Sequence, residues 1–293
     1  MTEQRTYPEG VTSWIDTEQA DVDAAADFYS GLFGWTFDEA TPPGVPFRYL
    51  IAQLDGRDVG GLGGPAASSG DAGDAGDAGD AGDAGGDGVA RWHTYVAVDD
   101  ADAAVRRVEQ AGGAVVQAPT AAGEGGRSAA VHDPQGLELR LWEARRRLGS
   151  QVTNVPGAWN FSDLHTDDPV AAQQFYGPAF GWAFADVGFA TMIRVPGYGD
   201  HLASTVDPDI HERQAGARVP PGFADAIGWV VPVAPGAEPG WHVTFTVAER
   251  DAAADRVVRL GGSVVRTGDN DWTRTAVVRD PQGAVFTVSQ FLG

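Results

Sequence analysis

The sequence contains no cysteine and no lysine, and all twenty of its basic residues are arginine. The absence of cysteine excludes disulfides, thiolate nucleophiles and cysteine-ligated iron–sulfur clusters. The absence of lysine excludes a Schiff-base lysine and the lysine of a phosphate-binding P-loop. A chain without cysteine fits the reducing cytoplasm, where we expect this protein to be found.

Long apolar runs and excess positive charge are also missing. No stretch of about 18 apolar residues occurs, so no membrane-spanning helix is expected. The N-terminus lacks the basic and apolar segments of a secretory signal peptide. The formal net charge of −21 argues against nucleic-acid binding, which depends on cationic side chains that neutralise phosphates. Such acidity keeps a protein soluble, and it also favours cationic ligands.

A low-complexity tract, DAGDAGDAGDAGDAGGDG, occupies residues 71–88. It has no aromatic or branched residue whose burial could offset the entropy of ordering, so we expect a disordered insertion. Its regularly spaced aspartates lack the terminal glutamate and the ligand spacing of an EF-hand loop.

The sequence contains the same pattern twice. FYSGLFG at 28–34 corresponds to FYGPAFG at 175–181, and DPQG at 133–136 recurs at 280–283. In both cases the copies lie 147 residues apart (175 − 28 and 280 − 133), a period far too long for a solenoid. We therefore predict two homologous globular domains in one chain.

The repeats set the expected domain boundaries. An N-terminal tail at 1–10 precedes domain 1 at 11–143, and a linker at 144–157 joins it to domain 2 at 158–293. In each domain the order of expected elements is strand, helix and strands, followed by a second strand, a second helix and a hairpin at the DPQG turn. Each domain is therefore predicted to contain two β-α-β-β-β modules.

Capping residues mark the first helix of each domain. Asp21 and Asp168 are suited to the N-terminal cap, because their carboxylates accept hydrogen bonds from free backbone N–H groups. Gly34 and Gly181 are suited to the left-handed conformation that ends a helix.

With these motifs the chain resembles the vicinal oxygen chelate superfamily, which includes glyoxalase I, extradiol dioxygenases and bleomycin-resistance proteins. Its two-domain form is similar to actinobacterial glyoxalase-like proteins. The matching pieces are D…FY..LFGW at 21–35, D…FY..AFGW at 168–182, the Trp-His pairs at 92–93 and 241–242, and both DPQG turns. The resemblance implies an α+β fold of tandem duplicated domains, whose paired modules form curved sheets around a cavity. It also implies a monomer that acts as an internal pseudo-dimer.

Metal-dependent members of this superfamily bind a divalent cation through His, Glu or Gln side chains, one from each of four strands. Carried over to this chain, three of these positions fall on Trp14, His93 and Arg140 in domain 1, and on Phe161, His242 and Thr287 in domain 2. The fourth falls near Gly60 or Gly61 and near Ala203. Each half thus keeps one histidine, and one histidine does not hold a hard dication. We expect no metal and no other cofactor; a divalent metal, for example at His165, Asp167 and His201, remains the alternative.

Alternation along the strands extends this comparison to neighbouring side chains. The candidate cavity-facing residues of domain 1 are Trp14, Asp16, His93, Tyr95, Glu138, Arg140 and Trp142. Those of domain 2 are Trp159, Phe161, Asp163, His242, Thr244, Thr287 and Ser289.

Two interpretations of these side chains remain open. Arg140 either pairs with Asp16 or Glu138 inside the protein, or anchors a carboxylate or carbonyl group of a ligand. His93 and His242 are either structural or candidate general bases. Because polar groups that converge among aromatics mark a binding site, we expect the ligand in domain 1, with domain 2 contributing mainly shape.

The resemblance and the residues together indicate two possible functions. The first is metal-independent binding of a small, cationic or aromatic molecule, as in bleomycin-resistance proteins. The alternative is a glyoxalase-like lyase, isomerase or oxygenase that acts on a small carbonyl or phenolic substrate. In that case His93 or His242 would be the base and Arg140 would stabilise the oxyanion.

Overall fold

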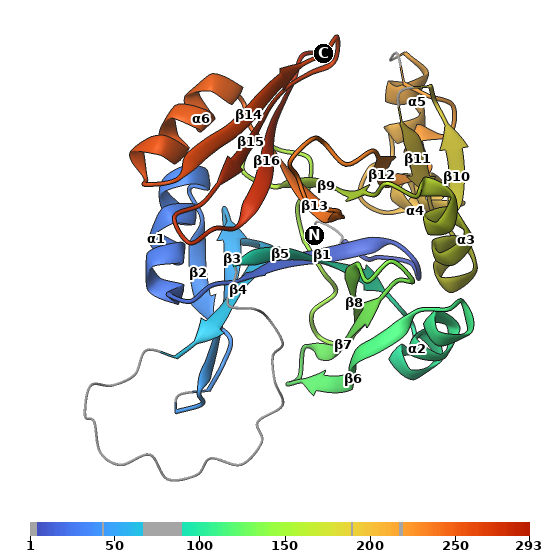
Figure 1. Cartoon of the computed structure of the whole chain (residues 1–293), viewed down its shortest axis with the longest axis horizontal. Helices are drawn as coiled ribbons and strands as arrows, with labels where there is room; N and C mark the ends of the chain where they lie inside the picture. The colour runs from blue at the N-terminus through green and yellow to red at the C-terminus, as the bar shows by residue number, and fades with distance from the viewer. Residues whose placement is uncertain (1–4, 43, 67–89, 189, 217–218) are drawn as a thin grey trace.

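The computed structural model describes residues 5–42, 44–66, 90–188, 190–216 and 219–293. Two eight-stranded sheets, one from each half of the chain, form the molecule (Figure 1). The expected α+β fold of duplicated domains is confirmed: the strand orders β2-β3-β4-β1-β5-β8-β7-β6 and β10-β11-β12-β9-β13-β16-β15-β14 correspond one to one. The 71–88 tract lies outside the described residues.

Domain 1 contains two modules, each with one helix and four strands. The first is β1 (Thr12–Glu18), α1 (Val22–Phe33), β2 (Thr36–Glu39), β3 (Phe47–Leu54) and β4 (Arg57–Pro65). The second is β5 (Arg91–Ala97), α2 (Ala101–Gln110), β6 (Ala114–Ala122), β7 (Gly126–His132) and β8 (Glu138–Ala144). The modules join where β1 pairs with β5, in antiparallel register, at the centre of the sheet.

Domain 2 repeats this arrangement with one addition. Its first module is β9 (Trp159–His165), α3 (Pro169–Phe180), β10 (Ala183–Asp186), β11 (Thr191–Arg194) and β12 (Ala226–Val231). Its second is β13 (Gly240–Thr246), α6 (Arg250–Arg259), β14 (Ser263–Asp269), β15 (Thr273–Arg279) and β16 (Val285–Phe291). Between β11 and β12 the chain forms α4 (Tyr198–Ser204), α5 (Ile210–Ala215) and the 3-10 turn η1 (Phe223–Asp225), which the sequence analysis did not predict.

This addition corrects one sequence alignment. Ala203 does not lie on a ligand-bearing strand, because it belongs to α4. In domain 1, Asp16 pairs with Gly61 on β4. Its counterpart in domain 2 is Asp163, and because the next residue, Leu164, pairs with Val230 in a parallel ladder, Asp163 lies opposite Trp229 on β12. Trp229 therefore corresponds to Gly61. The 31 residues at 195–225, between β11 and β12, displaced the alignment.

The predicted helix caps are confirmed. The carboxylates of Asp21 and Asp168 accept hydrogen bonds from the backbone N–H groups of Ala24 and Ala171. Gly34 and Gly181 end the helices with φ angles of 76° and 72°, in the left-handed region that favours glycine.

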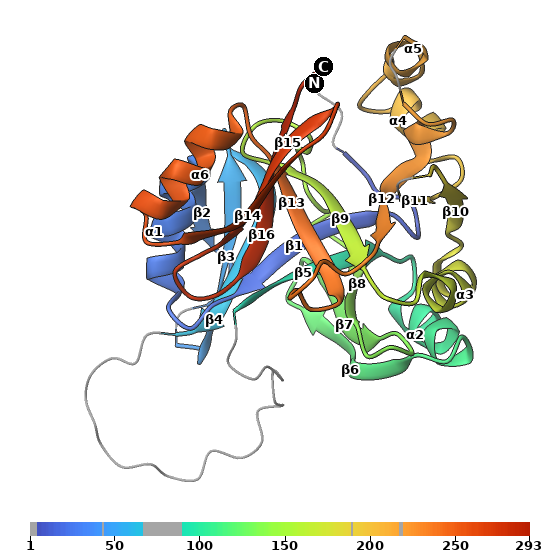
Figure 2. The same cartoon turned by 45° about the horizontal axis from the view of Figure 1, so that its top comes forward.

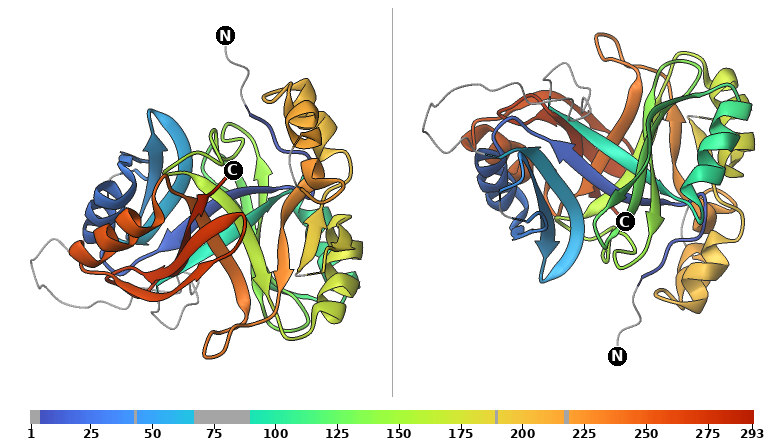
Figure 3. Two further views of the ribbon diagram at one scale, coloured as in Figure 1. Left: turned by 90° about the horizontal axis from the view of Figure 1, so that it is seen from above. Right: turned by 90° about the horizontal axis from the view of Figure 1, so that it is seen from below.

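The two hydrophobic cores cross the boundary between the domains. One combines α1 and its strands with α6, β13 and β16, and the other combines α2 and its strands with α3 and α4. Helix α1 accordingly lies beside α6, and α2 beside α3 (Figures 1 and 2). The two helix pairs occupy opposite ends of the molecule (Figure 3). The halves therefore form an internal pseudo-dimer whose cores need both domains.

The repeated motifs meet across this boundary. The Tyr29 hydroxyl, in the FY motif of domain 1, donates to Asp280 Oδ2 in the DPQG turn of domain 2 at 2.8 Å. Reciprocally, the Tyr176 hydroxyl donates to Asp133 Oδ2 at 3.1 Å. Each half therefore contacts the other through both repeated motifs.

No helix in the described ranges is both long enough and apolar enough to cross a membrane.

Candidate functional site

An ionic cluster occupies the concave face of domain 1. The guanidinium of Arg140 on β8 lies at its centre, with Nε 3.0 Å from Glu138 Oε1 and one terminal nitrogen 2.8 Å from Glu18 Oε1. The other terminal nitrogen lies 3.1 Å from the Tyr95 hydroxyl and 3.7 Å from Asp16 Oδ1. We call this set, with His93, the Arg140 cluster.

Aromatic side chains close the cluster on one side. Asp16 Oδ2 accepts hydrogen bonds from Tyr49 at 2.9 Å and from Tyr95 at 2.6 Å, and the Trp14 indole donates to the Tyr49 hydroxyl. Gly61 makes room for this arrangement, since a Cβ there would lie 2.0 Å from the Tyr49 hydroxyl. Trp14, Asp16 and Tyr95 are consequently buried.

The neighbours of His93 determine its tautomer. Arginine can only donate, so Nε2 of His93 must accept the 3.1 Å hydrogen bond from Arg140. Nδ1, 3.1 Å from Glu138 Oε1, then carries the proton. Burial disfavours the charged form of Glu138, but the hydrogen bond from His93 and the charge of Arg140 outweigh it and lower its pKa to about 2.

The sequence expectation of an Arg140 ion pair is therefore confirmed, and both named partners, Asp16 and Glu138, contribute. Six of the seven domain-1 candidates lie together in the Arg140 cluster and its aromatic neighbours: Trp14, Asp16, His93, Tyr95, Glu138 and Arg140. The seventh, Trp142, packs edge-on against Tyr95. Their polar groups are directed mainly at one another. Contact of this cluster with a ligand remains a prediction.

Domain 2 has smaller side chains at the corresponding positions. Thr244 lies opposite Thr287 on the neighbouring strand, where domain 1 has Tyr95 opposite Arg140. Ser289 occupies the position that corresponds to Trp142. A cavity of about 2070 Å³ opens on this face, above the typical range of roughly 300–1,000 Å³ for ligand sites. We call it the domain-2 cavity.

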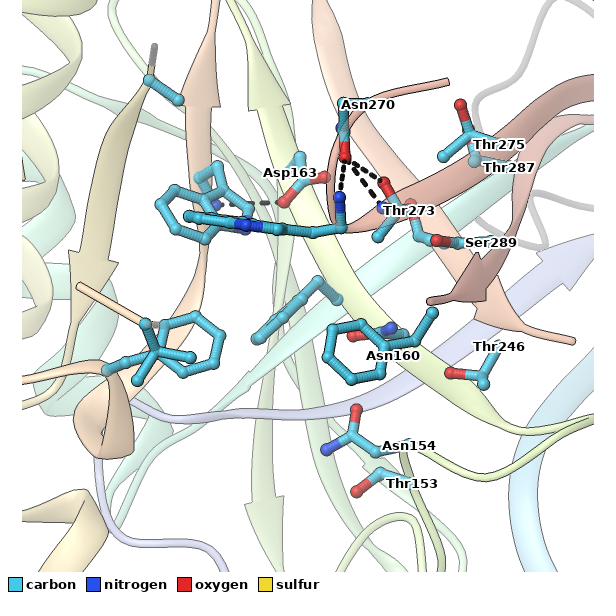
Figure 4. A pocket seen from close by; sticks show the side chains of 18 of the residues that line it. Thr153, Asn154, Asn160, Asp163, Thr246, Asn270, Thr273, Thr275, Thr287 and Ser289 are labelled. Carbon is cyan, nitrogen blue, oxygen red and sulfur yellow. Dashed lines mark hydrogen bonds between the residues drawn. The ribbon is translucent and has the colours of Figure 1, made fainter. Parts of the chain in front are cut away.

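One part of the domain-2 cavity is aromatic. The ring centroid of Phe161 on β9 lies 6.2 Å from that of Phe223, which in turn lies 6.0 Å from that of Trp229 on β12. Asp163 is among the side chains that line the cavity (Figure 4), and its Oδ1 accepts a hydrogen bond from the Trp229 backbone N–H at 3.0 Å.

Two histidines lie beside Asp163. The rings of His165 and His242 are 5.0 Å apart, and His242 Nε2 is 2.7 Å from the Thr287 hydroxyl. Burial, helped by the charge of Arg266, lowers the pKa of His165 to about 4. Burial, together with His165 and Arg266, lowers the pKa of His242 to about 3. Both rings are neutral at physiological pH and can accept or donate hydrogen bonds.

Burial acts in the opposite direction on Asp163. It raises the pKa of this carboxyl from 3.8 to about 7, and the hydrogen bond from Trp229 only partly offsets the rise. The cavity therefore holds a carboxyl group that changes charge near neutral pH. Such a group can donate a hydrogen bond or transfer a proton.

We expect Asp163→Asn to stabilise the protein at pH 8 by roughly 2–4 kcal/mol and to have little effect at pH 4. Between pH 4 and 7 the unfolded chain releases this proton while the folded protein keeps it, so folded wild type loses stability as the pH rises. Asparagine has no such titration. Urea unfolding at both pH values measures the difference, and an equal effect at pH 4 and 8 would contradict the raised pKa.

The donor sets do not fit the family's metal. The corresponding positions present Trp14, His93, Arg140 and Gly61 in domain 1, and Phe161, His242, Thr287 and Trp229 in domain 2. Within the described residues, no group of three or more His, Asp or Glu side chains is placed to hold a metal ion. The alternative metal site at His165, Asp167 and His201 does not form either. His201 lies on α4, where its ring contacts Thr6 of the N-terminal tail.

Some cavity residues were missed by sequence reasoning. They come from the linker, from neighbouring strands and from loops: Arg5, Thr153, Asn154, Asn160, Phe223, Trp229, Thr246 and Asn270. Strand alternation could have identified Thr246, two residues after Thr244. Asn160 lies on β9 beside an irregularity in its pairing with β13, and Trp229 lies on β12, which the inserted helices separate from β11 in the sequence. The residues from the tail, the linker and the turns carry no local signal, because their positions depend on long-range packing.

Comparison with known proteins agrees with the fold. Residues 19–141 match the family described as Glyoxalase/Bleomycin resistance protein/Dioxygenase superfamily, and residues 161–289 match a Glyoxalase-like domain. DnrV of Streptomyces peucetius, named an anthracycline biosynthesis protein, is 35% identical over 283 residues, which are 96% of this chain and 94% of DnrV. CFP32 of Mycobacterium tuberculosis, provisionally named a glyoxylase, is 30% identical over 292 residues, covering 98% and 97% of the two chains. The Mn(II)-bound glyoxalase from Novosphingobium aromaticivorans superposes with a TM-score of 0.57 at 14% identity, covering 96% of this chain and 82% of that one.

Proposed function

Because the chain belongs to the glyoxalase, bleomycin resistance protein and dioxygenase superfamily, we propose that it binds a planar aromatic small molecule in the domain-2 cavity. One observation carries this proposal. Tyr95, Arg140 and Trp142 fill the concave face of domain 1, whereas Thr244, Thr287 and Ser289 leave the same face of domain 2 open.

The lining supports an aromatic ligand. Phe161, Phe223 and Trp229 offer ring faces and edges, against which a flat ring system gains contact area. The carboxyl of Asp163 and the histidine pair provide hydrogen bonds that fix its orientation.

The local charge does not favour a cationic ligand, although the net charge of the chain does. Four arginines and three aspartates line the domain-2 cavity: Arg5, Arg57, Arg213, Arg266, Asp163, Asp207 and Asp271. Asp207 pairs with Arg213, and Asp163 is partly protonated near neutral pH. We therefore propose a neutral or weakly acidic aromatic compound, such as a phenol or a quinone.

We further propose that binding needs no metal, because neither donor set offers more than one histidine at the corresponding positions. The chain then acts as a monomer, since its two halves already complete each other's cores. A cytoplasmic location fits the absence of cysteine.

Trp229→Ala is expected to weaken binding of an anthraquinone about 30-fold or more, since it removes a large aromatic contact. Isothermal titration calorimetry after dialysis against a chelator measures the affinity. The matched control is Trp142→Ala in domain 1, which should leave it unchanged. The proposal fails if the anthraquinone does not bind, if Trp142→Ala is the variant that abolishes binding, or if binding requires added metal.

A second candidate function rests on the pKa of Asp163. A carboxyl group that titrates near 7 is suited to general acid–base catalysis at physiological pH. In that function Asp163, beside the neutral imidazole of His242, would move a proton on a phenolic or carbonyl substrate. If so, Asp163→Asn abolishes turnover of a bound compound but preserves its affinity; a variant that keeps full turnover excludes this role.

A further inference from the structure

One arginine of the domain-2 cavity is unpaired among the described residues. Arg266 lies on β14, the edge strand of the second sheet, and it lines the cavity. In the described part of the chain its side chain makes no hydrogen bond and no ion pair. Arg274, on the adjacent strand β15, differs because it pairs with Asp251 and Asp269. The cavity therefore holds a cation that is available to a ligand.

The strand register places Arg266 on the same wall as the aromatic part of the cavity. Arg266 lies opposite Val277 on β15, and Val277 lies opposite Thr287 on β16. Thr287 lies opposite Thr244 on β13, which in turn lies opposite Phe161 on β9. Residues directly opposite one another on adjacent strands share a face of the sheet. All five line the cavity, and we call them the Arg266 row.

The charge of Arg266 acts on the two histidines of the cavity. Burial lowers the pKa of both His165 and His242, and the positive charge of Arg266 contributes to the lowering in each case. His242 Nε2 lies 2.7 Å from the hydroxyl of Thr287, the middle residue of the row. Arg266 therefore lies close enough to the centre of the row to act on a group bound there.

The other charged residues of the lining do not cancel the charge of Arg266. They are three aspartates and three arginines: Asp163, Asp207, Asp271, Arg5, Arg57 and Arg213. Asp207 pairs with Arg213, and burial raises the pKa of Asp163 to about 7, so this carboxyl is only partly ionised near neutral pH. Asp271 lies in the turn between β14 and β15, beyond the end of the strand that carries Arg266. A positive charge therefore remains on this wall.

We propose that the Arg266 row binds an aromatic acid, whose ring system packs against Phe161 and whose ionised oxygen pairs with Arg266. The oxygen belongs to a phenolate or a carboxylate, since both accept hydrogen bonds from a guanidinium and from threonine hydroxyls. Adjacent strands lie about 4.8 Å apart, so the row from β14 to β9 spans about 19 Å and accommodates a fused ring system with its acidic group. This inference rests on the proposed function and specifies its substrate class as aromatic acids.

The test compares unsubstituted anthraquinone with a hydroxyanthraquinone and an anthraquinone carboxylate by calorimetry at pH 9, where both acids are ionised. All proteins carry Asp163→Asn, so that this carboxyl adds no charge to the cavity. Each acid should bind about tenfold more tightly than anthraquinone, because a charged hydrogen bond adds about that much. Arg266→Gln should remove this gain and leave the affinity for anthraquinone within a factor of two. Arg259→Gln, which removes the same charge at an exposed position of α6 outside the cavity, is the control.

A spectroscopic titration reports the ionisation of the ligand directly. The phenol and phenolate forms of a hydroxyanthraquinone absorb at different visible wavelengths. Binding should lower the pKa of its hydroxyl by about one unit, which corresponds to a tenfold preference for the anion. With Arg266→Gln the bound and free compounds should titrate together, whereas Arg259→Gln should keep the shift.

The outcomes separate this inference from the proposed function. If anthraquinone binds but neither acid binds more tightly, the acid subsite is wrong and the proposed function stands. The inference is also wrong if Arg266→Gln lowers all three affinities equally, or if Arg259→Gln has the same effect as Arg266→Gln. A gain for only one acid supports the inference and identifies which oxygen group the row binds. If none of the three compounds binds, the proposed function fails and the inference fails with it.

Discussion

Asp280→Ala should lower the free energy of unfolding by about 3–5 kcal/mol. Oδ1 of this buried carboxylate accepts backbone N–H groups from Gln282, Gly283 and Ala284. Oδ2 accepts from Gln19 and Tyr29 of domain 1 at 2.8 Å each. Alanine leaves these buried donors without an acceptor, and each unsatisfied group costs about 1–3 kcal/mol, although the losses overlap. Urea unfolding measures the change.

The same variant tests whether the two halves unfold as one unit. Because each core draws on both domains, hydrogen exchange in α1 and α3 should accelerate together in Asp280→Ala. Asp255→Ala, at an exposed position of α6, is the control and should change stability by less than about 0.5 kcal/mol. Faster exchange in α1 alone would show that the halves are energetically independent.

Arg140→Leu is expected to destabilise the fold by about 3–5 kcal/mol. The substitution removes the cation that pairs with Glu18 and Glu138 and leaves buried Asp16 without its nearest positive charge. Breaking a buried ion pair from one side is costly, because the remaining charges stay desolvated. Thermal and urea unfolding, with Arg145→Leu in the exposed part of the linker as control, measure the effect.

Arg140→Leu also distinguishes the two candidate sites. If the ligand occupies the domain-2 cavity, the folded fraction of the variant binds the anthraquinone with unchanged affinity. A stable variant that has lost binding would instead place the ligand at Arg140, as the sequence analysis expected. Arg140→Lys, which keeps the charge, should retain part of the lost stability.

The sequence alone determined the fold of this protein because its signals are local and repeated. Asp21, Gly34 and their counterparts Asp168 and Gly181 mark helix ends by their own backbone chemistry, and the structure confirms all four. The two DPQG turns at a constant offset established the duplication. Strand alternation also placed Asp16, His93 and Arg140 on one face, because the period of a strand is fixed.

Only the tertiary structure decided where a cavity opens. The number of polar groups expected on the concave face favoured domain 1 as the ligand site. The sequence does not show, however, that these groups form hydrogen bonds and ion pairs with one another. In the folded protein Arg140 pairs with Asp16 and Glu138, and these side chains fill their own space. The corresponding small side chains, Thr287 among them, leave room in domain 2. Other parts of the lining come from the tail, the linker, α4, α5, the turn before β12, β14 and β15. Only long-range packing brings segments so far apart in the sequence to one cavity wall.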